Sequence, residues 1–190
     1  MLDRTLPRPD RPPWSALGPP TSVHLALFVH LVIGLPKGLY MLVRDTEKLS
    51  GLRECCDPSF AWTRPDGCPT NLPLFHLKAG DARRVAAQVS CGQEIAGMGA
   101  FSLGMIAEFD GPIRKHGAWF YRRLFWETGA IGQVLYLEAE AAGVRGTGIG
   151  CFFDDPVHDL LGFKDRRFQS LYHFTVGGAV DDPRLTTLVC

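Results

Sequence analysis

Apolar residues recur between Trp119 and Ala142 at three-, four- and seven-residue steps, which is the spacing of one buried helix face. The residues of this stripe are Phe120, Leu124, Ile131, Leu135 and Ala142. Gly143 follows, and glycine is a common residue at the end of a helix. The pattern therefore predicts one long helix over residues 119–142.

Two runs rich in β-branched and aromatic residues, Val23–Ile33 and Gly38–Arg44, lie on either side of the turn residues 34–38. Such runs separated by glycine and proline predict a β-hairpin. Residues 72–77 and 170–176 carry the same kind of composition. They predict two further strands.

Four shorter helices are predicted from local patterns. Asp81 can cap a helix that extends through Ser90, because its apolar residues share one face. Asp155-Pro156 offers a cap followed by proline at the first helical position, which opens a helix that ends at Leu161. Residues 46–53 and 94–108 complete the set. A few strands mixed with several helices, without regular alternation, predict an α+β layer architecture.

Residues 7–20 (PRPDRPPWSALGPP) contain six prolines. Proline removes a backbone donor and clashes inside helices, so neither a helix nor an interior strand is expected there. We expect residues 1–20 to form an extended arm on the surface of a domain that covers residues 21–190. The arm has the composition of a connector within a longer parent protein.

Composition narrows the function. With 190 residues, 46% of them hydrophobic, the chain can form one domain with its own core. Its 20 basic and 20 acidic residues cancel, which argues against binding to nucleic acid or to an anionic membrane. The longest apolar run is far below the ~20 residues that a membrane span needs. No export signal is visible, so a cytoplasmic location is expected.

The six cysteines form no C-x-x-C pair and have no matching histidine spacing. We therefore expect no zinc site, and we expect reduced thiols that are mostly buried as small hydrophobic groups. Cys91 and Cys151 are assigned to packing rather than to nucleophilic chemistry. His24 and His30 lie six residues apart on one face of a strand. They could be two ligands of a metal site, but the sequence offers no third ligand. We expect two structural histidines.

The stretch Arg145–Cys151 (RGTGIGC) holds three alternating glycines. Without side chains, their backbone can approach a ligand closely. The stretch follows a helix, whereas a dinucleotide-binding fingerprint follows a strand and opens a helix. A ligand loop and a plain tight loop are both compatible with this pattern.

The segment 121–162 around this stretch resembles the nitroreductase-like superfamily. A long helix carrying G-x-x-x-Q (Gly129–Gln133) ends in Ala142-Gly143. An Ile149-Gly150 step follows, and then a short helix that ends in Leu161-Gly162. Residues 90–109 and the hairpin resemble the SagB-type dehydrogenase branch, and the likeness extends from about residue 20 to Leu188. It implies a nitroreductase-like α+β fold in which helices flank a central, mostly antiparallel sheet.

The resemblance also implies an FMN-dependent oxidoreductase. It places the backbone of Gly148, Ile149 and Gly150 at the isoalloxazine edge, with Gln133 as a further cofactor-binding residue. Arg184 becomes the phosphate ligand, with an ordinary surface arginine as the alternative. NAD(P)H is the implied electron donor and a small molecule the substrate, in a ping-pong cycle. Because relatives build the site across a twofold interface, a homodimer or pairing with a second nitroreductase-like domain is implied.

One departure from the family pattern supports a second hypothesis. The family's amino-terminal helix, with its Arg-Arg-Ser signature for phosphate, has no counterpart in a chain that starts MLDRTLPRPD. Arg4, Arg8 and Arg11 are the candidate substitutes. Without such contacts the chain would bind FMN weakly or not at all. It would then be a cofactor-free, non-catalytic subunit or domain that serves assembly.

Two carboxylates on the long helix are candidates for a catalytic pair. Glu127 and Glu138 lie eleven residues apart and so point to nearly the same side of the helix. Glutamates on a helix surface are usually solvated, and we expect these two to be so. No Lys-Tyr pair stands in the context expected of azoline-oxidising SagB enzymes, so peptide thiazole formation is not expected.

Overall fold

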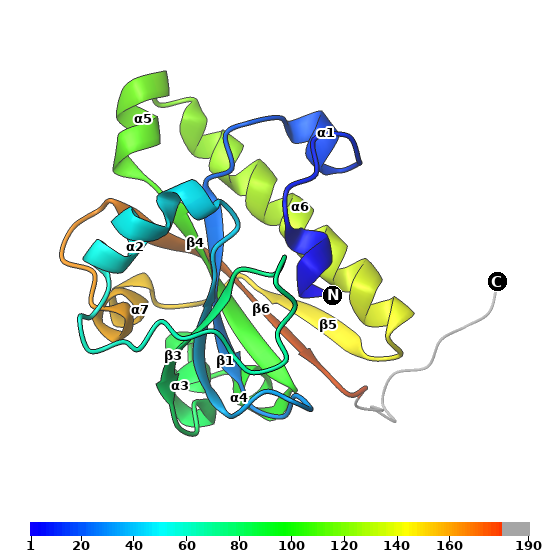
Figure 1. Ribbon diagram of the computed structural model, residues 1–190. Helices are drawn as coiled ribbons and strands as arrows, with labels where there is room; N and C mark the ends of the chain where they lie inside the picture. The colour runs from blue at the N-terminus through cyan, green and yellow to red at the C-terminus, as the bar shows by residue number, and fades with distance from the viewer. Residues whose placement is uncertain (180–190) are drawn as a thin grey trace.

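A six-stranded antiparallel sheet forms the centre of the protein (Figure 1). The computed structural model describes residues 1–179. The strand order is β3-β2-β1-β4-β6-β5. The strands are β1 (Val23–Val29), β2 (Gly38–Leu42), β3 (Leu74–Ala79), β4 (Phe101–Glu108), β5 (Arg145–Ile149) and β6 (Phe168–Gly177).

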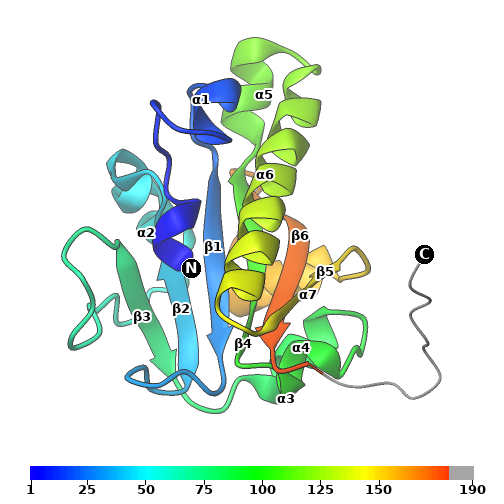
Figure 2. The same ribbon diagram turned by 90° about the vertical axis from the view of Figure 1, so that its right-hand side faces the viewer.

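Helices cover both faces of this sheet. They are the 3-10 turns η1 (Leu2–Thr5) and η2 (Thr46–Lys48), and the α-helices α1 (Trp14–Leu17), α2 (Leu49–Cys55), α3 (Arg83–Val89), α4 (Ile95–Met98), α5 (Asp110–His116), α6 (Phe120–Ala141) and α7 (Asp154–Leu161). The long helix α6 and the amino-terminal arm lie on one face (Figure 2), and α2, α3, α4 and α7 pack on the other. The predicted α+β fold with an antiparallel sheet is confirmed.

The sheet separates two hydrophobic cores. Along β1, Leu25 and Leu27 face the core beneath α6, whereas Ala26 and Phe28 face the core beneath α2, α3, α4 and α7. Successive side chains of a strand point to opposite faces, so a strand buried on both sides is apolar at nearly every position.

The strongest sequence patterns are confirmed. The hairpin pairs β1 with β2, with Leu27 opposite Tyr40. The long helix runs over residues 120–141. Phe120, Leu124, Ile131 and Leu135 of its predicted stripe are buried, whereas Ala142 is exposed just after the helix ends. Asp81 accepts the backbone N–H of Arg83 at 3.0 Å where α3 begins. The last short helix, α7, starts at Asp154, one residue before the predicted cap.

The predicted helix over residues 94–108 is wrong. Only Ile95–Met98 is helical, and residues 101–108 form the central strand β4 between β1 and β6. Both faces of β4 are covered, so its apolar residues do not alternate with polar ones. Periodicity alone does not separate such a strand from a buried helix.

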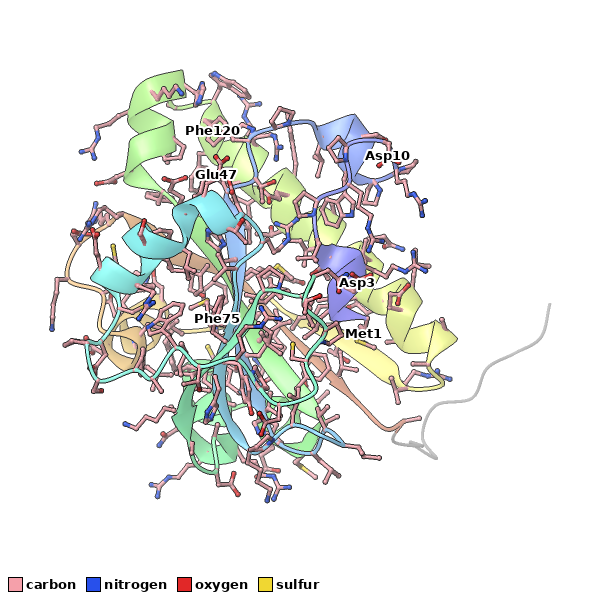
Figure 3. The ribbon with its side chains drawn as sticks, viewed as in Figure 1. Met1, Asp3, Asp10, Glu47, Phe75 and Phe120 are labelled. Atoms are coloured by element: carbon pink, nitrogen blue, oxygen red, sulfur yellow. The ribbon has the colours of Figure 1, made fainter. Side chains whose placement is uncertain are left out.

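The arm is folded more tightly than predicted. Trp14–Leu17 forms a one-turn helix within the proline-rich segment, where no helix was expected. Trp14, itself a residue of the arm, is buried. The amino group of Met1 lies 3.3 Å from the Glu138 carboxylate of α6. Figure 3 shows Met1 and Asp3 at this start of the chain. The prolines limit the helix to one turn and leave the rest of the arm irregular.

Candidate functional site

The glycine-rich stretch forms the edge strand β5 and not the predicted loop. In the described part of the chain β5 pairs with β6 alone, with Thr147 opposite Thr175 and Ile149 opposite His173. The N–H groups of alternate residues in an edge strand point away from the sheet. That of Gly148 is donated to the hydroxyl oxygen of Tyr136 on α6, at 2.8 Å. The strand edge and the long helix are thereby joined.

Two of the three glycines make room for aromatic rings of the chain itself. A Cβ on Gly146 would lie 2.8 Å from Cζ of Phe174, and one on Gly148 would lie 2.4 Å from the hydroxyl oxygen of Tyr172. Both distances are shorter than side chains tolerate, so these positions require glycine for packing. A Cβ on Gly150 would meet Tyr172 at an ordinary 3.8 Å. Packing therefore leaves only Gly150 unexplained.

A groove of about 360 Å³ lies where β5 and β6 meet α4. Its lining combines backbone, two hydroxyl side chains, one cation and two apolar side chains. The lining residues are Ile95, Met98, Gly99, Arg145, Gly146, Thr147, Thr175, Gly177 and Gly178. Small-molecule and cofactor pockets begin at about 300 Å³.

The chemistry of this groove suits a flat, anionic ligand. The Arg145 guanidinium is exposed and lies 3.1 Å from the Glu140 carboxylate, a surface pair that a phosphate can displace at little cost. The side chain of Met98 is 78% exposed and offers an apolar wall. A Cβ at Gly178 would meet open space, so the backbone there is accessible. By their chemical type, these groups suit the ring and the phosphate of a flavin mononucleotide.

The structure brings some of the predicted site residues together. Gly148, Ile149 and Gly150 are consecutive at the end of β5, although the side chain of Ile149 is buried in the core. Gln133 lies on the exposed side of α6, one turn before the Tyr136 that contacts Gly148. Arg184 lies outside the described residues.

Strand β6 carries a buried histidine, His173, opposite Ile149 of β5. Nδ1 of His173 is 3.1 Å from the Ser90 hydroxyl, and its Nε2 is 3.1 Å from the Ser170 hydroxyl. Phe152 stacks on the ring with centroids 4.6 Å apart. Burial lowers the pKa of His173 to about 4, so the imidazole is neutral at pH 7. Its partner Ser90 lies 83 residues earlier in the chain, so no local sequence pattern indicates this contact.

The expectation that Glu127 is solvated is wrong. This side chain is 2% exposed. Its carboxylate pairs with Arg44, accepts the backbone N–H of Ser22 at 3.0 Å and lies 3.7 Å from the Arg123 guanidinium. Glu127 stands seven residues after Phe120 and four before Ile131. Its place on the apolar stripe of α6 was therefore a signal for burial.

The same network fastens the arm. Arg44 donates to the carbonyl oxygens of Thr5 and Val23, at 2.6 and 2.8 Å, and lies over the Trp14 ring. Arg123 donates to the carbonyl of Gly18 at 2.8 Å. A buried charge pair requires such additional hydrogen bonds to offset its desolvation. The network is thus structural, and it lies on the α6 face, whereas the Thr147 and Thr175 side chains belong to the opposite face of the β5–β6 pair.

The arginines named as substitute phosphate ligands are engaged with acids. Arg8 pairs with Asp3, Arg4 lies 3.8 Å from Glu138, and Arg11 lies 3.8 Å from Asp10. They line a separate groove between the arm and α6. The histidines His24 and His30 likewise make internal contacts: Nδ1 of His24 accepts the Arg44 N–H, and Nε2 of His30 lies 2.9 Å from the Ala96 carbonyl oxygen.

Comparison with known proteins gives a fold likeness. No protein-family model matches the chain, and no curated protein matches its sequence. A solved structure from Anabaena variabilis, described as a nitroreductase, aligns with 83% of the chain at TM-score 0.63 and 24% identity. One from Ralstonia eutropha, also described as a nitroreductase, aligns with 86% at TM-score 0.56 and 16% identity. The Escherichia coli microcin synthetase complex McbBCD, with truncated pro-MccB17 bound, aligns with 95% at TM-score 0.64 and 19% identity.

These likenesses establish a nitroreductase-like fold and agree with the resemblance seen in the sequence. The chain spans 27%, 60% and 62% of the length of the three matched chains, respectively. Among the described residues, no helix has the length and apolar character required to cross a membrane.

Proposed function

We propose that the chain is an FMN-dependent oxidoreductase of the nitroreductase and SagB type. The observation that carries the proposal is the groove at the junction of β5, β6 and α4. It joins accessible backbone, a threonine hydroxyl and a displaceable arginine beside the glycine-rich strand. When bound, FMN would supply hydride transfer between NAD(P)H or another donor and a small-molecule substrate, in a ping-pong cycle.

Lining residues of the groove and predicted site residues outside its lining have proposed tasks. The backbone of Gly150, free of packing demands, would approach the ring edge together with Ile149. The Thr147 hydroxyl would hydrogen-bond to polar atoms of the ring or the ribityl chain. Arg145 would pair with the phosphate, as would Arg184 from outside the described residues. Gln133 would contribute from α6.

The long helix offers a surface for a second unit. The outward side of α6 exposes several large apolar side chains, namely Tyr121, Phe125, Trp126, Tyr136 and Leu137. Exposed apolar patches of this kind mark interaction surfaces. We propose that a second copy of the chain, or a second nitroreductase-like domain, covers this side of the helix.

One observation favours the second hypothesis, a cofactor-free subunit. The N–H of Gly148 is already satisfied by Tyr136, and the rings of Tyr172 and Phe174 fill the space beside two of the glycines. These contacts explain most of the glycine pattern without a cofactor. In this case the domain serves assembly.

Titration with FMN separates the two hypotheses. Purified chain is titrated with FMN while quenching of the flavin fluorescence is followed, in parallel with Arg145→Ala and the matched control Arg84→Ala on α3. The proposal expects saturable binding that Arg145→Ala weakens by about tenfold or more, as for loss of a charge-assisted hydrogen bond. Arg84→Ala should bind like the parent chain. If the parent chain does not bind FMN, the cofactor-free hypothesis stands.

A further inference from the structure

Two cysteines far apart in the sequence lie on neighbouring segments of the chain. Cys91 lies in the turn after α3, where it and Gly92 both adopt left-handed backbone angles, with φ of +55° and +72°. The Gly92 N–H closes the turn on the carbonyl of Ala87 at 2.9 Å. Cys151 directly follows Gly150, beyond the end of β5.

Hydrogen bonds hold these two segments against each other. The N–H of Phe153 donates to the carbonyl oxygen of Val89 at 2.8 Å. The side-chain amide of Gln93 donates to the carbonyl oxygens of both Ser90 and Cys151, each at 3.0 Å. These hydrogen bonds fix the segment that carries Cys91 against the segment that carries Cys151.

His173 adds a third fixed point. Ser90, which precedes Cys91, contacts one nitrogen of the imidazole, and Phe152, which follows Cys151, stacks on its ring. Both segments are thereby anchored to the same buried side chain of β6. The two segments are therefore held in place relative to the sheet.

Both side chains of this pair are reachable from solvent. The neighbouring Cys151 thiol raises the pKa of Cys91. Cys151 is exposed and Cys91 is half-buried. The adjacent pair Cys55 and Cys56 differs in being buried, and burial raises the pKa of Cys56 to about 12.

We propose that Cys91 and Cys151 form a reversible dithiol–disulfide couple that is oxidised by hydroperoxides. This role goes beyond the packing role expected from the sequence, and it requires no bound flavin. Disulfides inside cells are usually transient and redox-active, as such a couple would be.

The chemistry balances with a hydroperoxide as oxidant. The exposed Cys151 thiol ionises, and its thiolate attacks one oxygen of hydrogen peroxide. The O–O bond breaks, a sulfenic acid forms, and the departing hydroxide takes up the proton released by the thiol to give one water. The Cys91 sulfur then attacks the sulfenic sulfur, its proton leaves with the hydroxyl group as a second water, and the S–S bond closes. Two thiols are oxidised by two electrons, and one peroxide is reduced to two waters.

Peptide mapping tests the proposal directly. Trypsin cleavage after Arg84, Arg114, Arg145 and Lys164 gives peptides 85–114 and 146–164, each with one cysteine. After brief treatment with hydrogen peroxide and alkylation, mass spectrometry should find these two peptides joined, and a reductant should separate them. Under denaturing conditions, two of the six thiols should be lost.

Variants and a second probe complete the test. Cys68→Ser, the matched control in another loop, should leave the linked peptides unchanged, whereas Cys151→Ser should abolish them. Phenylarsine oxide, which binds paired thiols, should protect both cysteines of the unmutated protein from alkylation, so the test does not depend on a variant that folds. Linkage of other cysteines instead, or over-oxidation without linkage together with no arsenical protection, would overturn the proposal.

Discussion

The hydroxyl oxygen of Tyr136 accepts the N–H of Gly148 at 2.8 Å, so the last turns of the long helix support the glycine-rich edge strand. The Tyr136 ring also meets Phe174 edge-on, with centroids 4.8 Å apart. The order of the strand beside the candidate groove therefore depends on a side chain of another element. This dependence leads to a first prediction.

Replacing Tyr136 with phenylalanine should remove the hydrogen bond and keep the ring contact. The expected loss of stability is small, about 0.5–1.5 kcal/mol, because water can reach the freed N–H. Hydrogen exchange of the Gly148 amide, followed by NMR, should accelerate clearly while exchange in β1 stays slow. An unchanged rate at Gly148 would show that this contact does not hold the strand.

Alanine substitutions of glycines in β5 and directly after it should differ in their effect on stability. Gly146→Ala forces a methyl group against the buried ring of Phe174, and such overpacking typically costs about 1–3 kcal/mol. Gly150→Ala meets only an ordinary contact and should change stability by less than about 0.5 kcal/mol. Urea denaturation measures both. Equal effects at the two positions would refute the packing explanation for Gly146.

Removing Glu127 should be strongly destabilising. Glu127→Ala leaves the Arg44 guanidinium buried without its acid, and breaking a buried pair in this way costs about 3–5 kcal/mol. The matched control is Glu138→Ala on the same helix, which removes a more exposed pair with the amino terminus and should cost less than about 1 kcal/mol. Thermal and urea unfolding of both variants measure the difference.

The double variant Arg44→Met with Glu127→Leu refines this prediction. The double variant leaves one buried cation, Arg123, without its acid, where Glu127→Ala leaves both Arg44 and Arg123, so the double variant should be more stable than Glu127→Ala. A double variant as unstable as the single one would mean that the hydrogen bonds to the arm, rather than the charge pair, stabilise this region.

Stability should fall as the solution becomes more acidic. Burial lowers the pKa of His173 to about 4 and that of His24 to about 3, with Arg44 and Lys48 adding to the shift at His24. Below the ordinary histidine value of 6.5 the unfolded chain binds protons that the folded chain does not. Each histidine then contributes a loss of up to about 1.4 kcal/mol per pH unit as pH falls towards 4.

A series of urea denaturations between about pH 7.5 and about pH 5.5, roughly one unit on either side of the ordinary histidine pKa, checks this effect. Stability should be nearly flat above the ordinary histidine pKa and should decline below it. His173→Gln should show a shallower decline, because one of the titrating histidines is gone. A profile that does not change across this range would contradict the burial of neutral histidines.

The sequence predicted the elements whose patterns are local. The stripe from Phe120 to Leu135 and the turn between β1 and β2 depend on neighbours in the chain, and both were predicted correctly. Strand β4 was missed because burial on both faces removes the alternation that identifies a strand. Strand β5 was read as a loop because its glycines are explained only by rings that arrive from β6 and α6.

The candidate site was predictable to a similar extent. The Gly148–Gly150 segment was named from its resemblance to a family, and its contact with a cofactor stays a prediction. The groove wall at Met98 and the cation Arg145 were not predicted as site residues, since they meet only when α4 packs beside β5. The cysteine pair and the Ser90–His173 contact were also out of reach, because each joins residues about 60 or more positions apart.

The most direct test of the central claim, that the groove between β5, β6 and α4 receives FMN, is amide chemical-shift mapping by NMR. FMN is added stepwise to isotopically labelled protein. The account predicts saturable shifts at residues 146–150 and 177–178, with little change at Arg4, Arg8 and Arg11 of the arm. Shifts confined to the arm, or none at saturating FMN, would contradict it.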